Sequence, residues 1–346
     1  MLNRFRNKIY LIFFLKFVIY QTNIIINRFN ILKSKNELEE KKQLGKIKVI
    51  NRFYEIFTTL LFNFRNKVGI YSGHNADKIY QNPHNKILLC SIGKEENLYA
   101  KEFVEYYLSI GFDKIIILDN NDFNGEIFND ILKYFIQNKL VEIQDLRGLK
   151  QIQIPAFNYC YKKYMYLYDW IAFFDFDEYL FIKNSSNVKK YLYNSRFSKC
   201  QQILFNWYIY DDNNLLRYDN RTMITRFTHL KYFPGRTKFI VRGNIENLLI
   251  PSSHIATSVN YCNSKGEQIF PNSYIALPQE KNSFAYLKHF YTKTAEEYCH
   301  KRRRGYAQTL SKQNQNLSEI EINSFFKYNK KTKEKIKIFE KCQGIK

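Results

Sequence analysis

Residues 169–180 read DWIAFFDFDEYL, and this stretch decides both the fold and the place of the candidate site. Residues 169–174 predict a buried strand, because all but the first are apolar. We expect the strand to end directly on Asp175. Asp175 and Asp177 would then point to the same side, since they are two positions apart on an extended chain. Carboxylates this close to several phenylalanines are costly to bury unless they are paired or bind a metal.

The segments before this stretch alternate between apolar runs and patterns with helical periodicity. The runs predict strands at 86–92, 114–118 and 141–143, and the periodic patterns predict helices at 97–110, 126–137 and 155–167. Such alternation predicts an α/β fold, with a mostly parallel sheet and flanking helices. Ligands bind at the carboxyl ends of the strands in folds of this kind.

Three parts of the chain are expected from composition. Residues 1–85 would be an apolar and basic helical extension with a linker, 86–310 the main domain, and 311–346 a basic tail, either helical or disordered. Within the main domain, we expect two halves, 86–182 and 183–310. The pattern loosens after Leu180, where we expect strands at 202–210 and 237–241 and a helix at 295–311.

Asp175 and Asp177 are candidate ligands for a hard divalent cation. Mg²⁺ and Mn²⁺ prefer carboxylate oxygens and can bridge them to the diphosphate of a nucleotide. The cation would then offset the charge that develops on a departing nucleoside diphosphate. The alternative is a turn whose acidic side chains are only caps. The preceding buried strand and the apolar flanks favour the metal site.

Several motifs in order resemble those of glycosyltransferases with the A-type fold, family 2-like enzymes and especially family 92. The motifs are Ile92-Gly93-Lys94-Glu95-Glu96-Asn97, Gly111-Phe112-Asp113, Leu118-Asp119-Asn120-Asn121, Gln151 or Gln153 with Ala156 and Asn158, and residues 170–180. Weaker matches follow at Asn206-Trp207, at 238–242 with His254, and at 288–305. The chain departs from the family at Glu95, where the family usually has Asn.

The resemblance implies a nucleotide-binding half at 86–182 and an acceptor half at 183–310, with a metal site and a diphosphate site. Asp177 would bind the metal, Asp175 would contact the metal or the donor ribose, and His254 would complete the metal site. His289 and Lys293 would contact the diphosphate, for which a basic side chain is the right partner. A lone histidine is also often structural, which is the alternative for His254.

The resemblance also places the nucleoside near the ends of the first two strands. Asp119 and Asn120 end the second strand, where relatives hydrogen-bond the nucleoside; the alternative for Asp119 is a turn cap. Glu95 follows the first strand and would contact the donor, unless it only supplies negative charge to a helix N-terminus. The basic run at 301–304 is assigned to the surface.

The catalytic base stays open among several carboxylates. An inverting enzyme needs one carboxylate to take a proton from the acceptor hydroxyl. Glu178 is adjacent to the metal site, although the next side chain along a strand usually points away. Glu246 is a candidate by position only. Asp211 and Asp212 follow the predicted strand at 202–210 and are further candidates.

The implied activity is transfer of a hexose from a nucleotide diphosphate sugar, such as UDP-galactose, to a glycan or lipid-linked hydroxyl. The resemblance implies inversion, with Mn²⁺ or Mg²⁺ as cofactor, in the synthesis of surface polysaccharide or lipopolysaccharide. One alternative is a nucleotidyl or phosphoryl transferase that uses the same carboxylates, but the sequence lacks a glycine-rich phosphate loop. Another is an inactive relative that serves as an assembly partner.

The formal net charge of +22 favours anionic partners. No motif for binding RNA or DNA occurs, so nucleic acid is not an expected partner. Basic residues flank an apolar run at 9–20, which favours a helix lying on an anionic membrane over a buried or a spanning helix. The six cysteines are widely spaced, which favours a reducing compartment. The expected location is therefore cytoplasmic, at the inner face of the membrane.

Overall fold

The computed structural model describes residues 84–232, 236–257, 259–269, 283–305 and 317–344. The apolar run at 9–20 and almost all of the expected N-terminal extension lie outside these residues. Within the described ranges, no helix has both the length and the apolar character needed to cross a membrane.

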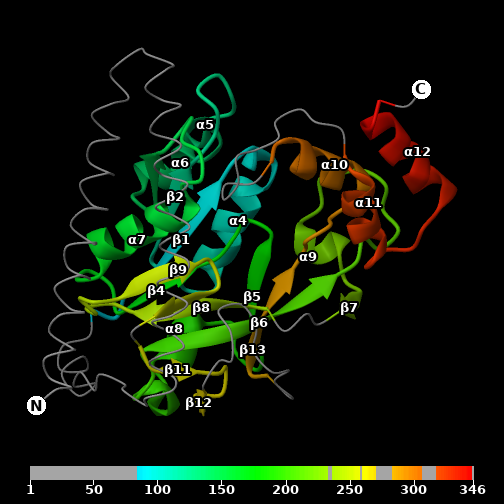
Figure 1. Ribbon diagram of the computed structural model, residues 1–346. Coiled ribbons are helices and arrows are strands. Elements are labelled where there is room, and N and C mark those ends of the chain that lie inside the picture. Colours follow the sequence, from blue (N-terminus) through cyan, green and yellow to red (C-terminus); the bar gives the residue numbers. More distant parts are fainter. Residues whose placement is uncertain (1–83, 233–235, 258, 270–282, 306–316, 345–346) are drawn as a thin grey trace, which may run out of the picture. The chain divides into compact units, whose positions relative to one another are not determined.

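A mixed sheet forms the centre of the described structure, with strand order β12-β11-β6-β8-β4-β1-β2-β3 (Figure 1). The parallel strands are β1 (Ile87–Gly93), β2 (Lys114–Asp119), β3 (Val141–Asp145) and β4 (Trp170–Phe173). β8 (Thr237–Arg242) lies antiparallel between β4 and β6 (Gln202–Tyr210). The expected α/β fold with a mostly parallel core is confirmed, and antiparallel strands extend it on one side.

The second half of β6 leaves this sheet and pairs with other strands. There β13 (Ala285–His289) runs parallel to β6 and antiparallel to β5 (Glu178–Ile182). The remaining strands are β7 (Leu230–Tyr232), β11 (Tyr261–Cys262), β12 (Gln268–Ile269) and the hairpin of β9 (Leu249–Ser252) and β10 (Ile255–Thr257). Strand β13 therefore joins β5, which follows the turn after β4, to the second half of β6.

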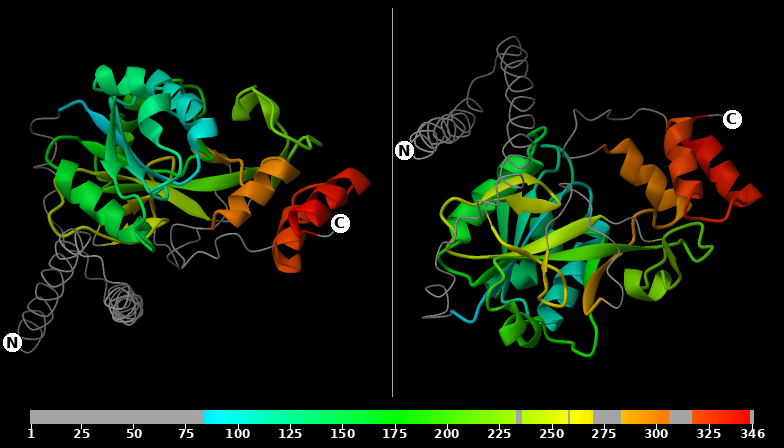
Figure 2. Two further views of the ribbon diagram at one scale, coloured as in Figure 1. Left: turned by 90° about the horizontal axis from the view of Figure 1, so that it is seen from above. Right: turned by 60° about the horizontal axis from the view of Figure 1, so that its bottom comes forward.

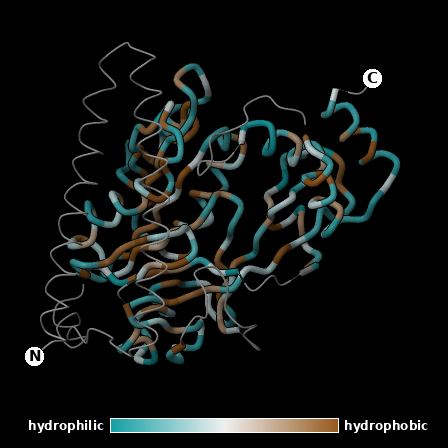
Figure 3. The backbone as a smooth tube through the Cα atoms, viewed as in Figure 1, coloured by the Kyte–Doolittle hydropathy of each residue, from teal (hydrophilic) through white to brown (hydrophobic). Residues whose placement is uncertain are grey.

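Helices cover both faces of the parallel strands. They are α4 (Asn97–Ser109), α5 (Phe128–Ile131), α6 (Lys133–Gln137) and α7 (Gln153–Tyr164), followed by α8 (Val188–Leu192) and α9 (Met223–Arg226). On β1, Ile87 and Leu89 belong to the core that includes α4, whereas Leu88 and Cys90 belong to the core that includes α7. The apolar runs are continuous because these strands are buried on both faces. Figure 3 shows the hydrophobic residues concentrated along these strands.

The elements differ from the sequence predictions in three places. The helix expected at 126–137 is two short helices, α5 and α6, which meet at Leu132. The helix expected at 155–167 spans Gln153–Tyr164, and the one expected at 295–311 is α10 (Ala295–Arg303). In the expected C-terminal tail, α11 (Glu319–Phe326) and α12 (Lys333–Cys342) pack against α10. Figure 2 shows these three helices side by side in two views.

The prediction that the fourth strand ends on Asp175 is wrong. β4 ends at Phe173, and residues 174–177 form a turn into β5. The Glu178 amide donates to the Asp175 carbonyl oxygen at 3.0 Å, and the Asp175 amide donates to the Glu178 carboxylate at 2.9 Å. These two hydrogen bonds close the turn, so Asp175 and Asp177 do not follow the alternation of an extended strand.

Two of the widely spaced cysteines form a disulfide, Cys200–Cys262. The fold brings them together because β11 pairs in parallel with the start of β6, where Cys262 is the register partner of Ile203. Disulfides persist in oxidising compartments. The expectation of a reducing compartment, which rested on cysteine spacing, is therefore not supported. Cys90, Cys160, Cys299 and Cys342 are free and buried.

Candidate active site

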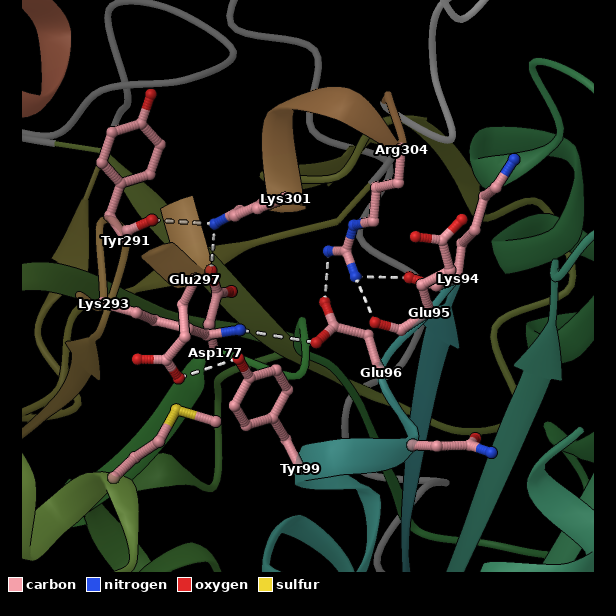
Figure 4. Close-up of polar contacts among 12 residues, drawn as sticks. Lys94, Glu95, Glu96, Tyr99, Asp177, Tyr291, Lys293, Glu297, Lys301 and Arg304 are labelled. Atoms are coloured by element: carbon pink, nitrogen blue, oxygen red, sulfur yellow. Dashed lines mark hydrogen bonds and ion pairs between the residues drawn. The ribbon is translucent and has the colours of Figure 1, made fainter. Parts of the chain in front are cut away.

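The candidate site lies where the segments after β1 and β4 meet helix α10 (Figure 4). β1 ends at Gly93, where an added Cβ would lie 2.6 Å from a ring carbon of Phe128 and 2.7 Å from one of Phe176. Since real Cβ atoms do not approach so closely, only glycine lets the two aromatic rings pack against the strand end. The next three residues, Lys94, Glu95 and Glu96, therefore start the site in a fixed position.

Asp177 is 5% exposed and pairs with two basic side chains. Lys301 Nζ donates to its carboxylate, and His289 Nε2 lies 3.6 Å from the same oxygen. Burial alone would raise the pKa of Asp177, but the charge of Lys301 and the proximity of His289 hold it well below its usual value. Asp177 is therefore ionised, with its charge compensated by α10.

Asp175 pairs with a different lysine. Lys238 Nζ, from β8, donates to Asp175 Oδ2 at 2.7 Å and lies 3.5 Å from the Glu178 carboxylate. Burial lowers the pKa of Lys238, and the charges of Asp175 and Glu178 more than offset this, so the net pKa is raised. The two aspartates thus lie within one turn, but Asp177 is neutralised by Lys301 of α10 and Asp175 by Lys238 of β8.

Glu178 is fully buried beside this pair. Burial raises its pKa well above the usual value, despite the opposing charge of Lys238. One carboxylate oxygen accepts the Asp175 amide, and the other has no hydrogen-bond partner among the described residues. These contacts suit a residue that fixes the turn around Asp175.

Glu96 is the second carboxylate that α10 and its flanks neutralise. It is 5% exposed, lies 3.4 Å from Lys293 Nζ and accepts from Arg304. Lys293 is 2% exposed, and its ammonium lies 3.5 Å from the centre of the Tyr99 ring. Arg304 also donates to the carbonyl oxygens of Lys94 and Glu95. The segment after β1 is thereby attached to the end of α10.

His254 is held as a neutral imidazole. Its Nδ1 lies 2.7 Å from the Thr237 carbonyl oxygen, which can only accept, so Nδ1 carries the proton and Nε2 keeps its lone pair. Burial lowers the pKa of His254 to about 4. Its ring centre lies 5.1 Å from that of Trp207, which in turn lies 4.2 Å from that of His289. Both histidines therefore flank one tryptophan, Trp207 of β6.

The residues expected to contact the nucleoside lie next to this site. Asp119 is buried, accepts the Asn121 amide at 3.0 Å, and has a pKa raised by burial. The Asn120 side chain donates to the carbonyl oxygens of Leu146 and Leu149 at 3.2 and 2.7 Å, which gives it a structural role. Glu95 is exposed, and its amide donates to the Asn121 side chain at 2.6 Å.

The candidate bases do not come together. Glu246 is exposed and follows Arg242, the register partner of Trp170 at the start of β4, so it belongs to the opposite edge of the sheet from Asp175. Its selection by position in the sequence is therefore not supported. Asp212 is buried against Lys335 of α12 at 2.5 Å, which is a structural contact. Asp211, at the end of β6, lies 3.7 Å from His229 and 3.6 Å from Lys231.

The assignment of the basic run at 301–304 to the surface is wrong for all but one residue. Lys301 and Arg304 contact Asp177 and Glu96, Arg302 is buried, and Arg303 alone is exposed. Thr294 and Glu297 form a capping box that starts α10. Positions four and seven beyond Glu297 lie on one helix face, which is the face of Lys301 and Arg304. This capping signal was present in the sequence and would have placed both cations.

The sequence model of the family described as Glycosyltransferase family 92 matches residues 87–340. A family 92 glycosyltransferase protein of Ricinus communis is 20% identical over 200 residues. That similarity covers 56% of this chain and 36% of the Ricinus protein, so the chain matches about a third of its relative's length. The family match extends over most of the chain and includes every strand of the candidate site. The chain therefore belongs to glycosyltransferase family 92.

Proposed function

We propose that the chain transfers a hexose from a nucleoside diphosphate sugar, a UDP-sugar such as UDP-galactose, to a glycan hydroxyl with inversion. Family membership supports glycosyl transfer. The observation that carries the proposal is the set of buried carboxylates and cations at the carboxyl ends of β1 and β4, including Asp177, Glu96 and Lys301. Ligands of α/β sheets bind at this edge. His289 and Lys293, as proposed diphosphate contacts, belong to the same set.

The proposed cofactor is Mn²⁺ or Mg²⁺, and the residues present fit it in chemistry. Asp175 and Asp177 supply carboxylate oxygens, and the neutral His254 keeps a lone pair on Nε2. Among the described residues no group of three or more His, Cys, Asp or Glu side chains is arranged to hold an ion. A bound cation would stabilise the negative charge of the leaving diphosphate.

The base of the proposed reaction must contact the acceptor hydroxyl. Glu178 is sealed from solvent and hydrogen-bonds the Asp175 amide, so we propose that it positions Asp175. Asp211 lies at the end of β6, beyond the Ile209 position that pairs with His289. We propose Asp211 as the base, because its side chain is 12% exposed and is therefore open to an acceptor hydroxyl.

The acceptor is proposed to be a surface glycan or a lipid-linked precursor. The formal net charge of +22 supports an anionic acceptor or an anionic surface around it. The Cys200–Cys262 disulfide favours an oxidising compartment for the acceptor half, rather than the cytoplasmic face that we expected from the sequence.

Calorimetric titration of UDP, with and without Mn²⁺, tests the donor site. We expect Mn²⁺-dependent binding in the wild type and its loss in Asp177→Ala. Asp219→Ala is the matched control, because Asp219 is an acidic residue whose partner, Arg221, lies at the surface. Transfer from UDP-hexoses to glycan acceptors is then measured. Unchanged UDP binding in Asp177→Ala would remove Asp177 from the donor site, and absence of any sugar transfer would reject the proposed activity.

A further inference from the structure

The cations that α10 and its flanks bring to the site outnumber their acidic partners. Lys293, Lys301 and Arg304 share two carboxylates, those of Glu96 and Asp177. Figure 4 shows all three cationic groups converging between the segment after β1 and the turn after β4. With every group ionised, one positive charge in this largely buried set has no carboxylate of its own. A site with this balance is suited to an added anion.

The side chains at the C-terminal end of α10 are also partly open to solvent. The side chains of Lys301 and Arg304 are 13% and 12% exposed, whereas Arg226, which pairs with Glu297 at the other end of the helix, is 0% exposed. An incoming ligand can therefore reach Lys301 and Arg304 without separating α10 from the rest of the protein. Arg226 offers no such access.

We propose that Lys301 and Arg304 bind the diphosphate of the donor together with Lys293, and that they give up Asp177 and Glu96 when they do so. This inference rests on the proposed function, and it adds two diphosphate ligands and an exchange of partners. A diphosphate carries more negative charge than either carboxylate, and it presents several acceptor oxygens to a lysine and an arginine. The exchange also leaves the Asp177 carboxylate free for a cation.

The carbonyl contacts of Arg304 extend the exchange to the segment after β1. Arg304 donates to the carbonyl oxygens of Lys94 and Glu95. When Arg304 turns to a diphosphate, these carbonyl oxygens lose a donor, and the segment that follows Gly93 is released from α10. Diphosphate binding at α10 is thereby linked to the loop that starts α4.

Titration calorimetry with UDP, UMP, uridine and inorganic pyrophosphate tests the inference on the full chain. We expect Lys301→Gln and Arg304→Gln each to weaken UDP binding about ten- to a hundredfold, since each removes a charged hydrogen bond. UMP binding should fall less, and uridine binding should not change. Arg303→Gln is the control, because Arg303 lies on the same helix but is exposed. Thermal unfolding of each variant shows that it is folded.

Three results would overturn the inference. The first is that the variants bind UDP as tightly as the wild type does. The second is that they lose affinity for uridine and for UDP equally. The third is that the wild type binds none of UDP, UMP and pyrophosphate. Lys301→Arg keeps the positive charge, so its affinity for UDP should stay within a few-fold of the wild type. If Lys301→Gln does not fold, Lys301→Arg and Arg304→Gln are the two variants that test the inference. Sugar transfer is measured separately. Phosphate binding through α10 without transfer would reject only the proposed function, whereas transfer by a protein whose variants bind UDP normally would reject only this inference.

Discussion

The two ends of α10 hold ion pairs of different kinds. At the N-terminal end, Glu297 accepts two hydrogen bonds from Arg226 at 3.0 and 2.9 Å, and the two side chains are 3% and 0% exposed. At the C-terminal end, Lys301 and Arg304 contact carboxylates while remaining partly open to solvent. This difference in exposure separates the buried charges that support the fold from those that are available to a ligand. The sealed pair is closed to solvent, and Glu297 also accepts from Tyr99 and Thr294 within the protein. A pair that is open to solvent can exchange a partner for a ligand.

The largest expected effect comes from breaking the sealed pair. Glu297→Ala should lower the free energy of unfolding by about 3–5 kcal/mol, because it leaves the Arg226 guanidinium buried without a carboxylate. Urea denaturation followed by circular dichroism measures this loss. Glu296→Ala is the control one residue away, with a side chain that is 40% exposed, and it should change stability by less than about 0.5 kcal/mol. A similar small loss for both variants would show that the sealed pair does not support the fold.

A smaller loss of stability is expected at the open end. Asp177→Asn keeps the shape of the side chain and leaves Lys301 able to reach water, so it should cost about 1–2 kcal/mol. Its rate of sugar transfer should nevertheless fall about 100- to 1000-fold, because Asp177 is a proposed ligand of the cation that would stabilise the leaving diphosphate. Denaturation and initial rates measure the two effects on one preparation. Equal stability losses for Asp177→Asn and Glu297→Ala would remove the distinction between the two ends.

The smallest expected effect on stability comes from the titration of Glu297 in the sealed pair, which occurs in acid and not near neutral pH. Burial alone would raise the pKa of Glu297, but the hydrogen bond and charge of Arg226 lower it below its ordinary value of 4.5. The contribution of Glu297 to stability is therefore complete above about pH 4.5 and is lost as the pH falls through the lower pKa of the folded protein. The difference in unfolding free energy between the wild type and Glu297→Gln should shrink over that range. A difference that does not depend on pH would contradict this assignment.

The parallel strands and the acidic turn could be predicted from the sequence because their signals are local. The continuous apolar runs of β1 and β2 reflect burial on both faces, and the apolar run of β4 leads into the turn that carries Asp175 and Asp177. Lys238 could not be predicted as the partner of Asp175, since it arrives on β8, an antiparallel strand inserted next to β4 from 63 residues away. Its role depends on sheet order, which local patterns do not contain.

The basic run on α10 shows a different kind of failure. Four consecutive basic residues suggest a solvated surface, yet a helix distributes neighbours over different faces. Lys301 and Arg304 turn toward the site, while Arg303 turns to solvent. Reading the helix from its capping box at Thr294 would have separated them.

The disulfide has a consequence for the integrity of the acceptor half. Cys200 and Cys262 are 62 positions apart, and the segment between them contains all of β6 and β8 and the β9–β10 hairpin with His254. A protease cut anywhere in this segment would leave two pieces joined by a covalent bond. The nicked protein would migrate as one species on a non-reducing gel and as two fragments after reduction. Lys238 and His254 would thus stay attached to the rest of the site even in a chain that is no longer continuous.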